Sequence, residues 1–267
     1  MALKYPVLLV HGMGFRDGKL FNYWGRIPKF LEQRGCKIFY GFQDSNGTIE
    51  NNAAFLKQRI VEILESSGAE KLNVIAHSKG GLDMRYAISV LNVQGIASLT
   101  TVQTPHHGSK TMDVVCRLPA PLLKFAGWCT DTCLKIQGDK KPEGYKVFLS
   151  FSAKNAEIFN QKVPDRDDVY YQSYAFAMKN PFSDIFMMFT NIIVGIFDGK
   201  NDGLLSPESA MWGDFRGTFT GNSLRGISHC DEVDMYRFRL TRKKGNGISD
   251  ITEIYDDIIT QLERKGF

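Results

Sequence analysis

The chain has 267 residues, of which 43% are hydrophobic and 23% are charged. That composition suits one soluble domain with a sizeable core, or at most two small ones. A formal net charge of +4, spread over scattered Lys and Arg with no aromatic-interleaved basic motif, argues against a nucleic-acid partner.

The first half of the chain alternates short apolar runs with amphipathic stretches. The apolar runs read as strands at 7–10, 37–41, 72–76 and 98–104. The amphipathic stretches read as helices at 22–34, 48–66 and 79–91. Continuous apolar strands alternating with helices predict a mostly parallel, doubly wound sheet of the α/β class, covered on both faces.

The alternation of predicted strands and helices stops between residues 107 and 143. That stretch carries Pro119, Pro121 and Pro142 and no strand pattern, so we expect a helical insertion within one domain that spans 1–267. Beyond it we expect a helix at 144–162, a strand at 169–178 and a closing helix at 249–265.

The most apolar stretch of the chain, residues 185–197, is too short to span a membrane. It is interpreted as a short helix followed by a buried strand at 191–197. The basic run at 237–244 is interpreted as a solvated loop, with an anionic-surface patch as the alternative.

The pentapeptide AHSKG, residues 76–80, joins a predicted strand to a predicted helix. So tight a turn needs small residues on either side of its centre, and Ala76 and Gly80 supply them. The pattern predicts a nucleophile elbow that exposes the Ser78 hydroxyl above the sheet. The alternative is a serine that caps the next helix.

A serine nucleophile needs a histidine base, and the base needs an acid that orients it. The chain has five histidines: His11, His77, His106, His107 and His229. In folds with a nucleophile elbow the order along the chain is serine, acid, histidine. His229 is therefore the histidine that leaves room for an acid between itself and Ser78.

The acid should follow a strand on a turn. The segment IFDGKNDGLL offers Asp198 and Asp202. We favour Asp202, because Asn-Asp-Gly forms a tight turn before apolar residues, although such a tripeptide is also an ordinary surface turn.

Two backbone N–H groups should form the oxyanion hole. One is the amide of Lys79, directly after the serine. The other is the amide of Met13 in HGMGF, where Gly12 and Gly14 allow close approach of the backbone. A glycine-rich turn after a first strand can also cradle a phosphate, but the spacing of a nucleotide-binding motif is absent.

The five cysteines have no metal-cluster spacing and are expected to be free thiols, as in a reducing compartment. No signal-peptide pattern precedes the first strand, so we expect a cytoplasmic protein, or a secreted one if a leader has been removed. We expect a monomer.

These motifs together resemble the bacterial true lipases of the α/β-hydrolase superfamily, the group typified by Pseudomonas and Burkholderia triacylglycerol lipases. The similar segments, in chain order, are YPVLLVHGMGF, VIAHSKGGLDMRYAI, ASLTTVQTPHHGSKTMD, NDGLLSPESAMWG, ISHCDEVD and YDDIITQLERKGF. The resemblance implies the α/β-hydrolase fold, with Ser78 as nucleophile, His229 as base and Asp202 as its acid.

The resemblance also implies a lid over the site at about 114–138 and lipid-ester substrates met at a lipid–water interface. Candidate walls of an acyl-chain cleft are 122–128 and 185–189. Alternatives with the same triad are a short-chain, polyester or thioester hydrolase and an acyltransferase. A non-catalytic binding protein of the same fold is the alternative of another class.

The family carries a structural calcium near its catalytic histidine, which here implies Asp231 with Asn180 or Asp184 as its partner. The family's disulfide is absent, because Ser206, Pro207 and Glu208 stand where its cysteine would be. A related lipase group binds zinc through a histidine pair, but no histidine lies between His11 and His77, so we expect no zinc.

Overall fold

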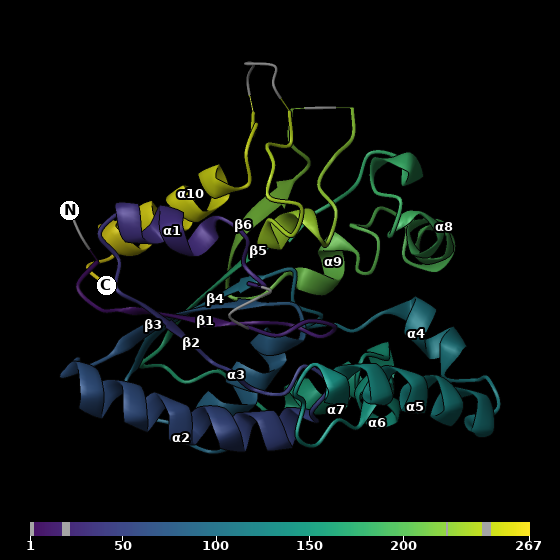
Figure 1. The fold of residues 1–267 in the computed structure, drawn as a ribbon, viewed down its shortest axis with the longest axis horizontal. Helices are drawn as coiled ribbons and strands as arrows, with labels where there is room; N and C mark the ends of the chain where they lie inside the picture. The colour runs from purple at the N-terminus through teal and green to yellow at the C-terminus, as the bar shows by residue number, and fades with distance from the viewer. Residues whose placement is uncertain (1–2, 18–21, 223, 242–246) are drawn as a thin grey trace.

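The computed structural model describes residues 3–17, 22–222, 224–241 and 247–267. Within them one sheet of six parallel strands has the order β2-β1-β3-β4-β5-β6 (Figure 1). The strands are β1 (Val7–Val10), β2 (Ile38–Tyr40), β3 (Leu72–His77), β4 (Ile96–Val102), β5 (Tyr170–Phe176) and β6 (Asp214–Phe219). The predicted α/β class with a parallel sheet is confirmed.

Helices cover both faces of the sheet. The α-helices are α1 (Ile27–Gln33), α2 (Ile49–Ser67), α3 (Lys79–Ser89), α4 (Lys110–Val115), α5 (Ala120–Ile136), α6 (Gly144–Ser150), α7 (Ala153–Lys162), α8 (Met188–Phe197), α9 (Pro207–Ala210) and α10 (Thr252–Arg264). Two 3-10 helices are η1 (Pro181–Ser183) and η2 (Asp231–Val233). In Figure 1, α1 and α10 lie on one face of the sheet, and α2 and α3 lie on the other.

Strand β1 shows why the apolar runs are continuous. Val7 and Leu9 belong to the core beneath α1 and α10, whereas Leu8 and Val10 belong to the core beneath α2 and α3. All four side chains are fully buried, since successive residues of a strand point to opposite faces and both faces are covered.

The order of the strands determines where a site can form. From β1 the chain passes to one neighbour, β2, and then returns to the other side of β1 as β3. Ligands of doubly wound sheets bind at the carboxyl ends of strands beside such a reversal. His11 follows β1 and Ser78 follows β3, so both lie at this position.

The predicted insertion at 107–143 contains α4 and α5 and no strand. The single helix predicted at 144–162 is two helices, α6 and α7. They are separated at Ser152, whose side chain accepts a hydrogen bond from the Asn155 amide and caps α7. Serine at an N-cap begins a new helix because it satisfies an amide that has no partner within the helix.

The prediction of a strand at 191–197 is wrong. These residues form the second half of α8, in which Asn191 and Val194 are buried and most of the apolar side chains face outward. The prediction failed because it equated apolar with buried. The strand that pairs with the outer side of β5 is β6, an edge strand of mostly partly exposed residues whose mixed sequence DFRGTF gave no apolar run.

No helix in the described ranges is long and apolar enough to cross a bilayer. The basic run at 237–244 lies in part outside these ranges, at 242–244. All five cysteines are free thiols, as expected.

Candidate active site

Ser78 occupies a strained turn between β3 and α3. Its backbone has φ 51° and ψ −129°, a conformation that residues with a side chain rarely adopt and that is concentrated at functional sites. The Ser78 side chain makes no capping hydrogen bond to α3, which removes the helix-cap interpretation. The geometry is that of a nucleophile elbow.

The elbow tolerates no side chain at Gly80. A Cβ atom there would lie 2.5 Å from the His11 carbonyl oxygen and 2.7 Å from that of Val10. Both obstacles are backbone atoms that cannot rotate away. Gly80→Ala is therefore expected to lower the free energy of unfolding by about 1–3 kcal/mol, as overpacking does, in urea denaturation followed by circular dichroism.

Gly195→Ala is the matched control, because its Cβ would meet only the Asn201 side chain, at 3.7 Å, on an exposed part of α8. It is expected to stabilise the protein by up to about 1 kcal/mol, because alanine is the better helix former. Equal stability of the Gly80→Ala variant and the wild type would contradict the packing argument.

His229 and Asp202 form a close pair beside the elbow. His229 Nδ1 lies 2.5 Å from Asp202 Oδ2, and the other oxygen of Asp202 accepts hydrogen bonds from the amides of Leu204 and Leu205. Burial raises the pKa of Asp202, but the His229 ring and these amides outweigh it and hold the pKa below its ordinary value. Asp202 therefore stays ionised and orients His229.

The runner-up acid has a different role. Asp198 accepts hydrogen bonds from Ser109, Lys110 and Thr111 at the start of α4 and so caps that helix. The expectation that the acid directly follows a strand is wrong. Asp202 lies on a turn that comes after α8.

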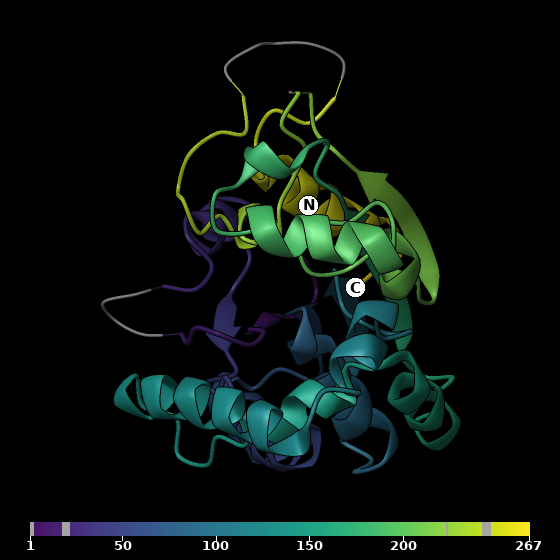
Figure 2. The same ribbon diagram turned by 90° about the vertical axis from the view of Figure 1, so that its right-hand side faces the viewer.

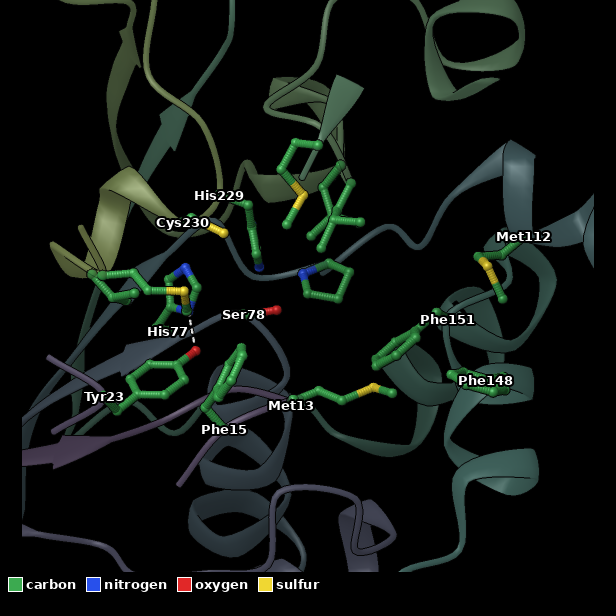
Figure 3. Close-up of a pocket in the computed structure, with 17 residues that line it drawn as sticks. Met13, Phe15, Tyr23, His77, Ser78, Met112, Phe148, Phe151, His229 and Cys230 are labelled. Carbon is green, nitrogen blue, oxygen red and sulfur yellow. Dashed lines mark hydrogen bonds between the residues drawn. The ribbon is translucent and has the colours of Figure 1, made fainter. Parts of the chain in front are cut away.

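Ser78 and His229 line one pocket of about 360 Å³ (Figure 3). In Figure 3 a ring nitrogen of His229 points toward Ser78, whose hydroxyl faces into the pocket. Since Asp202 holds Nδ1, Nε2 is the nitrogen available to the serine. The apolar part of the lining is Met13, Phe15, Pro105, Met112, Phe148, Phe151, Met187, Leu204, Leu205, Val233 and Met235.

The cleft walls expected at 122–128 and 185–189 are mostly wrong, because Met187 is their one residue in this lining. The lining comes instead from five other segments. They are the loop after β1 at 13–15, α4, the end of α6 with Phe151 just beyond it, the acid loop around Asp202 and the histidine loop around His229. Neither His106 nor His107 lines the pocket. His106 is buried against Thr101 and Arg85, and His107 contacts the Met211 carbonyl.

Comparisons with known proteins agree with this geometry. The family described as palmitoyl protein thioesterase matches residues 6–236. Triacylglycerol lipase 2 of Saccharomyces cerevisiae is 31% identical over 92% of this chain and 74% of its own length. A triacylglycerol lipase of Burkholderia plantarii is 41% identical, over 43% of this chain and 33% of its own length.

The chain belongs to the palmitoyl protein thioesterase family and is related to triacylglycerol lipases. It is an enzyme, a serine ester hydrolase, and the resemblance to bacterial lipases is confirmed. Solved structures of low identity share its fold. The mature lipase BlEst2 of Bacillus licheniformis has a TM-score of 0.71 at 19% identity, covering 98% of this chain and 93% of its own. The Staphylococcus hyicus lipase has a TM-score of 0.68 at 19% identity, covering 98% of this chain and 97% of its own.

In this lipase-family protein a buried network lies beneath the pair of His229 and Asp202. His77 Nδ1 lies 2.7 Å from the Tyr23 hydroxyl, and His77 Nε2 lies 2.9 Å from Glu232 Oε2. The same Glu232 oxygen lies 3.5 Å from His229 Nδ1. Glu232 and Tyr23 gave no signal in the sequence.

The ionisation of this network follows from its burial. Burial, with the nearby His229 and His11 rings, holds the pKa of His77 well below its ordinary value, so His77 is neutral. Burial, reinforced by the Asp202 carboxylate, raises the pKa of Glu232 well above its ordinary value. The unfolded chain therefore releases the Glu232 proton at a lower pH than the folded one.

The sign of this shift predicts a pH effect on stability. Above the ordinary pKa of 4.5, the folded state binds more protons than the unfolded state, so Glu232 makes the wild type less stable as pH rises toward its folded pKa. Glu232→Gln cannot ionise, so its stability relative to the wild type is expected to increase between pH 5 and 8. Urea denaturation at each pH measures the difference, with exposed Glu65→Gln as the control. A flat difference for Glu232→Gln would refute the assignment.

The two amides proposed for the oxyanion hole, those of Met13 and Lys79, lie in segments that hydrogen bonds hold in place. Met13 lines the pocket, and the loop before it is fixed by His11, whose ring nitrogens contact the Gly12 and Gln43 carbonyls. The Gly12 amide donates to the Tyr23 hydroxyl, which joins the loop to His77. Lys79 is the first residue of α3, and its buried side chain pairs with Asp83.

Two groups of side chains contain atoms that could bind a metal ion. The ligand-capable atoms of His77, His229 and Glu232 lie within 4.8 Å of one another, and the hydrogen bonds described above already account for them. Of the residues expected on calcium, Asp184 and Asp231 do meet, both in contact with Ser228 Oγ. Asn180 does not join them, since its amide donates to the Leu224 carbonyl.

Proposed function

We propose that this enzyme hydrolyses lipid esters through an acyl-enzyme on Ser78. The Ser78 oxygen attacks the ester carbonyl carbon while His229 Nε2 takes the hydroxyl proton. Asp202 stabilises the imidazolium that forms. The C–O bond to the alcohol then breaks, and His229 returns the proton to the leaving oxygen. The observation that carries this proposal is a strained serine sharing a pocket with a carboxylate-oriented histidine.

The amides of Met13 and Lys79 would hold the carbonyl oxygen as it becomes negative. Donors already in place for that charge lower the barrier without reorganisation of solvent. Water, activated by His229, then attacks the acyl carbon, and the Ser78 oxygen leaves with the proton. Every step uses side chains and amides of this chain.

The pocket supports the proposed substrate class. Its lining of methionine, phenylalanine and leucine side chains suits an acyl chain, because burying apolar surface contributes about 25 cal/mol per Å². The relatives named triacylglycerol lipases support an acylglycerol as the ester. A short-chain ester would leave most of this surface unfilled.

Two helices near the pocket expose apolar side chains and support action at a lipid surface. In Figure 2, α8 (green) crosses the upper half of this side of the molecule and α5 (teal) lies along the bottom. Large exposed side chains on these helices are Leu122, Phe125, Trp128 and Ile136 on α5, and Phe189, Ile192, Ile193 and Ile196 on α8. Apolar patches of this kind mark membrane or partner contacts. The insertion that contains α5 is the proposed lid.

The test is hydrolysis of p-nitrophenyl esters from acetate to palmitate, in detergent solution and in emulsion. We expect kcat/KM to peak at long chains and to rise in emulsion. A peak at acetate or butyrate would keep the serine chemistry and reject the lipid substrate in favour of a short-chain or polyester hydrolase.

The contribution of α8 is tested by Ile192→Glu with Ile196→Glu. The pair should reduce hydrolysis of emulsified esters by about tenfold and leave p-nitrophenyl acetate hydrolysis unchanged, because a charge cannot enter apolar lipid cheaply. Val61→Glu is the control, because Val61 is an apolar residue on α2 that is 47% exposed, close to the 49% of Ile192. Equal losses in both proteins would show that α8 has no special contact with lipid.

The second candidate is a long-chain acyl thioesterase, which the matched family description favours. The acyl half of the substrate and the acyl-enzyme are the same, and only the leaving group changes from oxygen to sulfur. Palmitoyl thioesters and palmitoyl esters compared at equal concentration decide between them by kcat/KM.

A further inference from the structure

The carboxylates of Asp184 and Asp231 lie close together just behind the catalytic histidine. Ser228 Oγ contacts Asp184 Oδ2 at 2.6 Å and Asp231 Oδ2 at 3.0 Å. Both side chains are almost fully buried. Two buried carboxylates at such a distance repel each other strongly and need a compensating positive charge.

The Arg225 side chain supplies that charge. Its Nη2 lies 3.0 Å from Asp231 Oδ2, and its Nε donates to the Ser183 carbonyl at 2.6 Å. Ser183 in turn donates its hydroxyl to the Arg225 carbonyl. The guanidinium plane also lies over the Phe238 ring, 5.5 Å from its centroid. Arg225 thus links η1 to the loop that carries His229.

The donors around these carboxylates do not fit a calcium ion. Calcium takes six to eight oxygen ligands. Here Asp184 accepts hydrogen bonds from the Tyr236 hydroxyl and the Phe186 amide, besides Ser228. Asp231 accepts from the Ser228 amide and from Arg225. The guanidinium and the amide N–H groups offer no oxygen to a calcium ion, and they occupy carboxylate lone pairs that the ion would need.

We propose that Arg225 is a built-in cation that does the work of a structural calcium in this chain and positions His229 without any metal. The linkage to the site is short. Asp231 lies two residues after His229, its carboxylate holds the Ser228 amide, and the His229 amide donates to the Asp202 carbonyl. Without the positive charge of Arg225, the carboxylates of Asp231 and Asp184 repel each other, and this repulsion displaces the segment between Ser228 and Asp231.

The experiment compares wild type, Arg225→Ala, Arg225→Lys and Arg239→Ala in excess EDTA and in millimolar calcium chloride. Melting temperature is measured for each, together with kcat and KM on a p-nitrophenyl ester. Arg239 is the matched control, because it lies on a neighbouring loop, is 65% exposed and is 3.5 Å from Asp250.

We expect wild type to have the same melting temperature and kcat in EDTA and in calcium. Arg225→Ala should melt about 5 °C or more lower, as when one partner of a buried ion pair is removed, and Arg239→Ala should not. Its kcat should fall by about 10–100-fold with KM nearly unchanged, because His229 is displaced and the acyl pocket is not. Arg225→Lys should recover part of both losses.

A fall of wild-type melting temperature in EDTA that calcium reverses would overturn the proposal. So would an Arg225→Ala protein that melts and reacts like Arg239→Ala. If Arg225→Ala fails to fold, Arg225→Lys and the EDTA comparison of wild type still decide. The melting temperatures do not depend on the proposed substrate, so failure of that function is distinguishable from failure of this inference.

Discussion

Replacement of Ser78 by alanine is expected to reduce kcat/KM for p-nitrophenyl esters by about 10⁴-fold or more, with the melting temperature nearly unchanged. The hydroxyl oxygen is the atom that would form the acyl-enzyme. The Cys230 thiol also lines the pocket, but burial raises its pKa to about 12 and keeps it protonated, so it is a poor substitute. The side chain makes no capping hydrogen bond to α3, so its loss costs α3 nothing.

Covalent labelling by a fluorophosphonate probe tests the same residue independently of substrate choice. Wild type should take up one equivalent, and Ser78→Ala none. Ser66→Ala, an exposed serine on α2, is the control and should behave as wild type. Unlabelled wild type would revive the alternative of a non-catalytic binding protein, and full activity of Ser78→Ala would remove the elbow assignment.

Asp202→Asn is expected to lower kcat by about 10⁴-fold with little change in KM. Asparagine keeps the shape but not the charge, so it neither stabilises the imidazolium nor holds the productive tautomer of His229. Measurement of kcat on p-nitrophenyl esters at several pH values checks the prediction. Asp198→Asn is the matched control, because that side chain caps α4 and makes no contact with His229.

Glu232 is the other carboxyl group that could orient His229, and its contribution would contradict the assignment of Asp202 as the acid. Its Oε2 lies 3.5 Å from the same nitrogen of His229 that contacts Asp202 at 2.5 Å. Because its pKa is raised well above its ordinary value, we expect Glu232 to be neutral and a poor substitute. If Asp202→Asn loses less than tenfold and only the double variant with Glu232→Gln loses activity, the two carboxylates share the role.

The prediction of Asp202 rested on a wrong element, although the structure pairs this residue with His229. Asp202 was expected directly after a strand at 191–197, but those residues form α8. The tripeptide Asn201-Asp202-Gly203 still makes a tight turn, because Asn201 Oδ1 accepts a hydrogen bond from the Gly203 amide. Turn chemistry is local and survives an error in the element that precedes it.

The apolar helix α8 shows the opposite case. Its sequence MFTNIIVGIF suits a buried strand or a buried helix equally well, and short apolar runs do not distinguish them. Which alternative forms depends on what the rest of the chain offers to cover it. Here β6 takes the place beside β5, and α8 is left with an exposed apolar face.

The sequence by itself determined strands β1 to β5, the elbow at Ser78 and the choice of His229, but not the edge strand β6. Strand and helix periods and the size of residues around a tight turn are readable within a few residues. The order of serine, acid and histidine along the chain then selects His229. The agreement of several such motifs in one order was enough to indicate the α/β-hydrolase fold.

Only the tertiary structure decided which polar groups surround the triad and what charge balances Asp184 and Asp231. His77 and Glu232 are 155 positions apart, and Ser183 and Arg225 are 42 apart. The partner of a buried donor or acceptor is whatever the packing of distant elements brings within hydrogen-bond distance. No local pattern encodes that choice, so neither the network under His229 nor the guanidinium beside Asp231 could be predicted from the residues that form it.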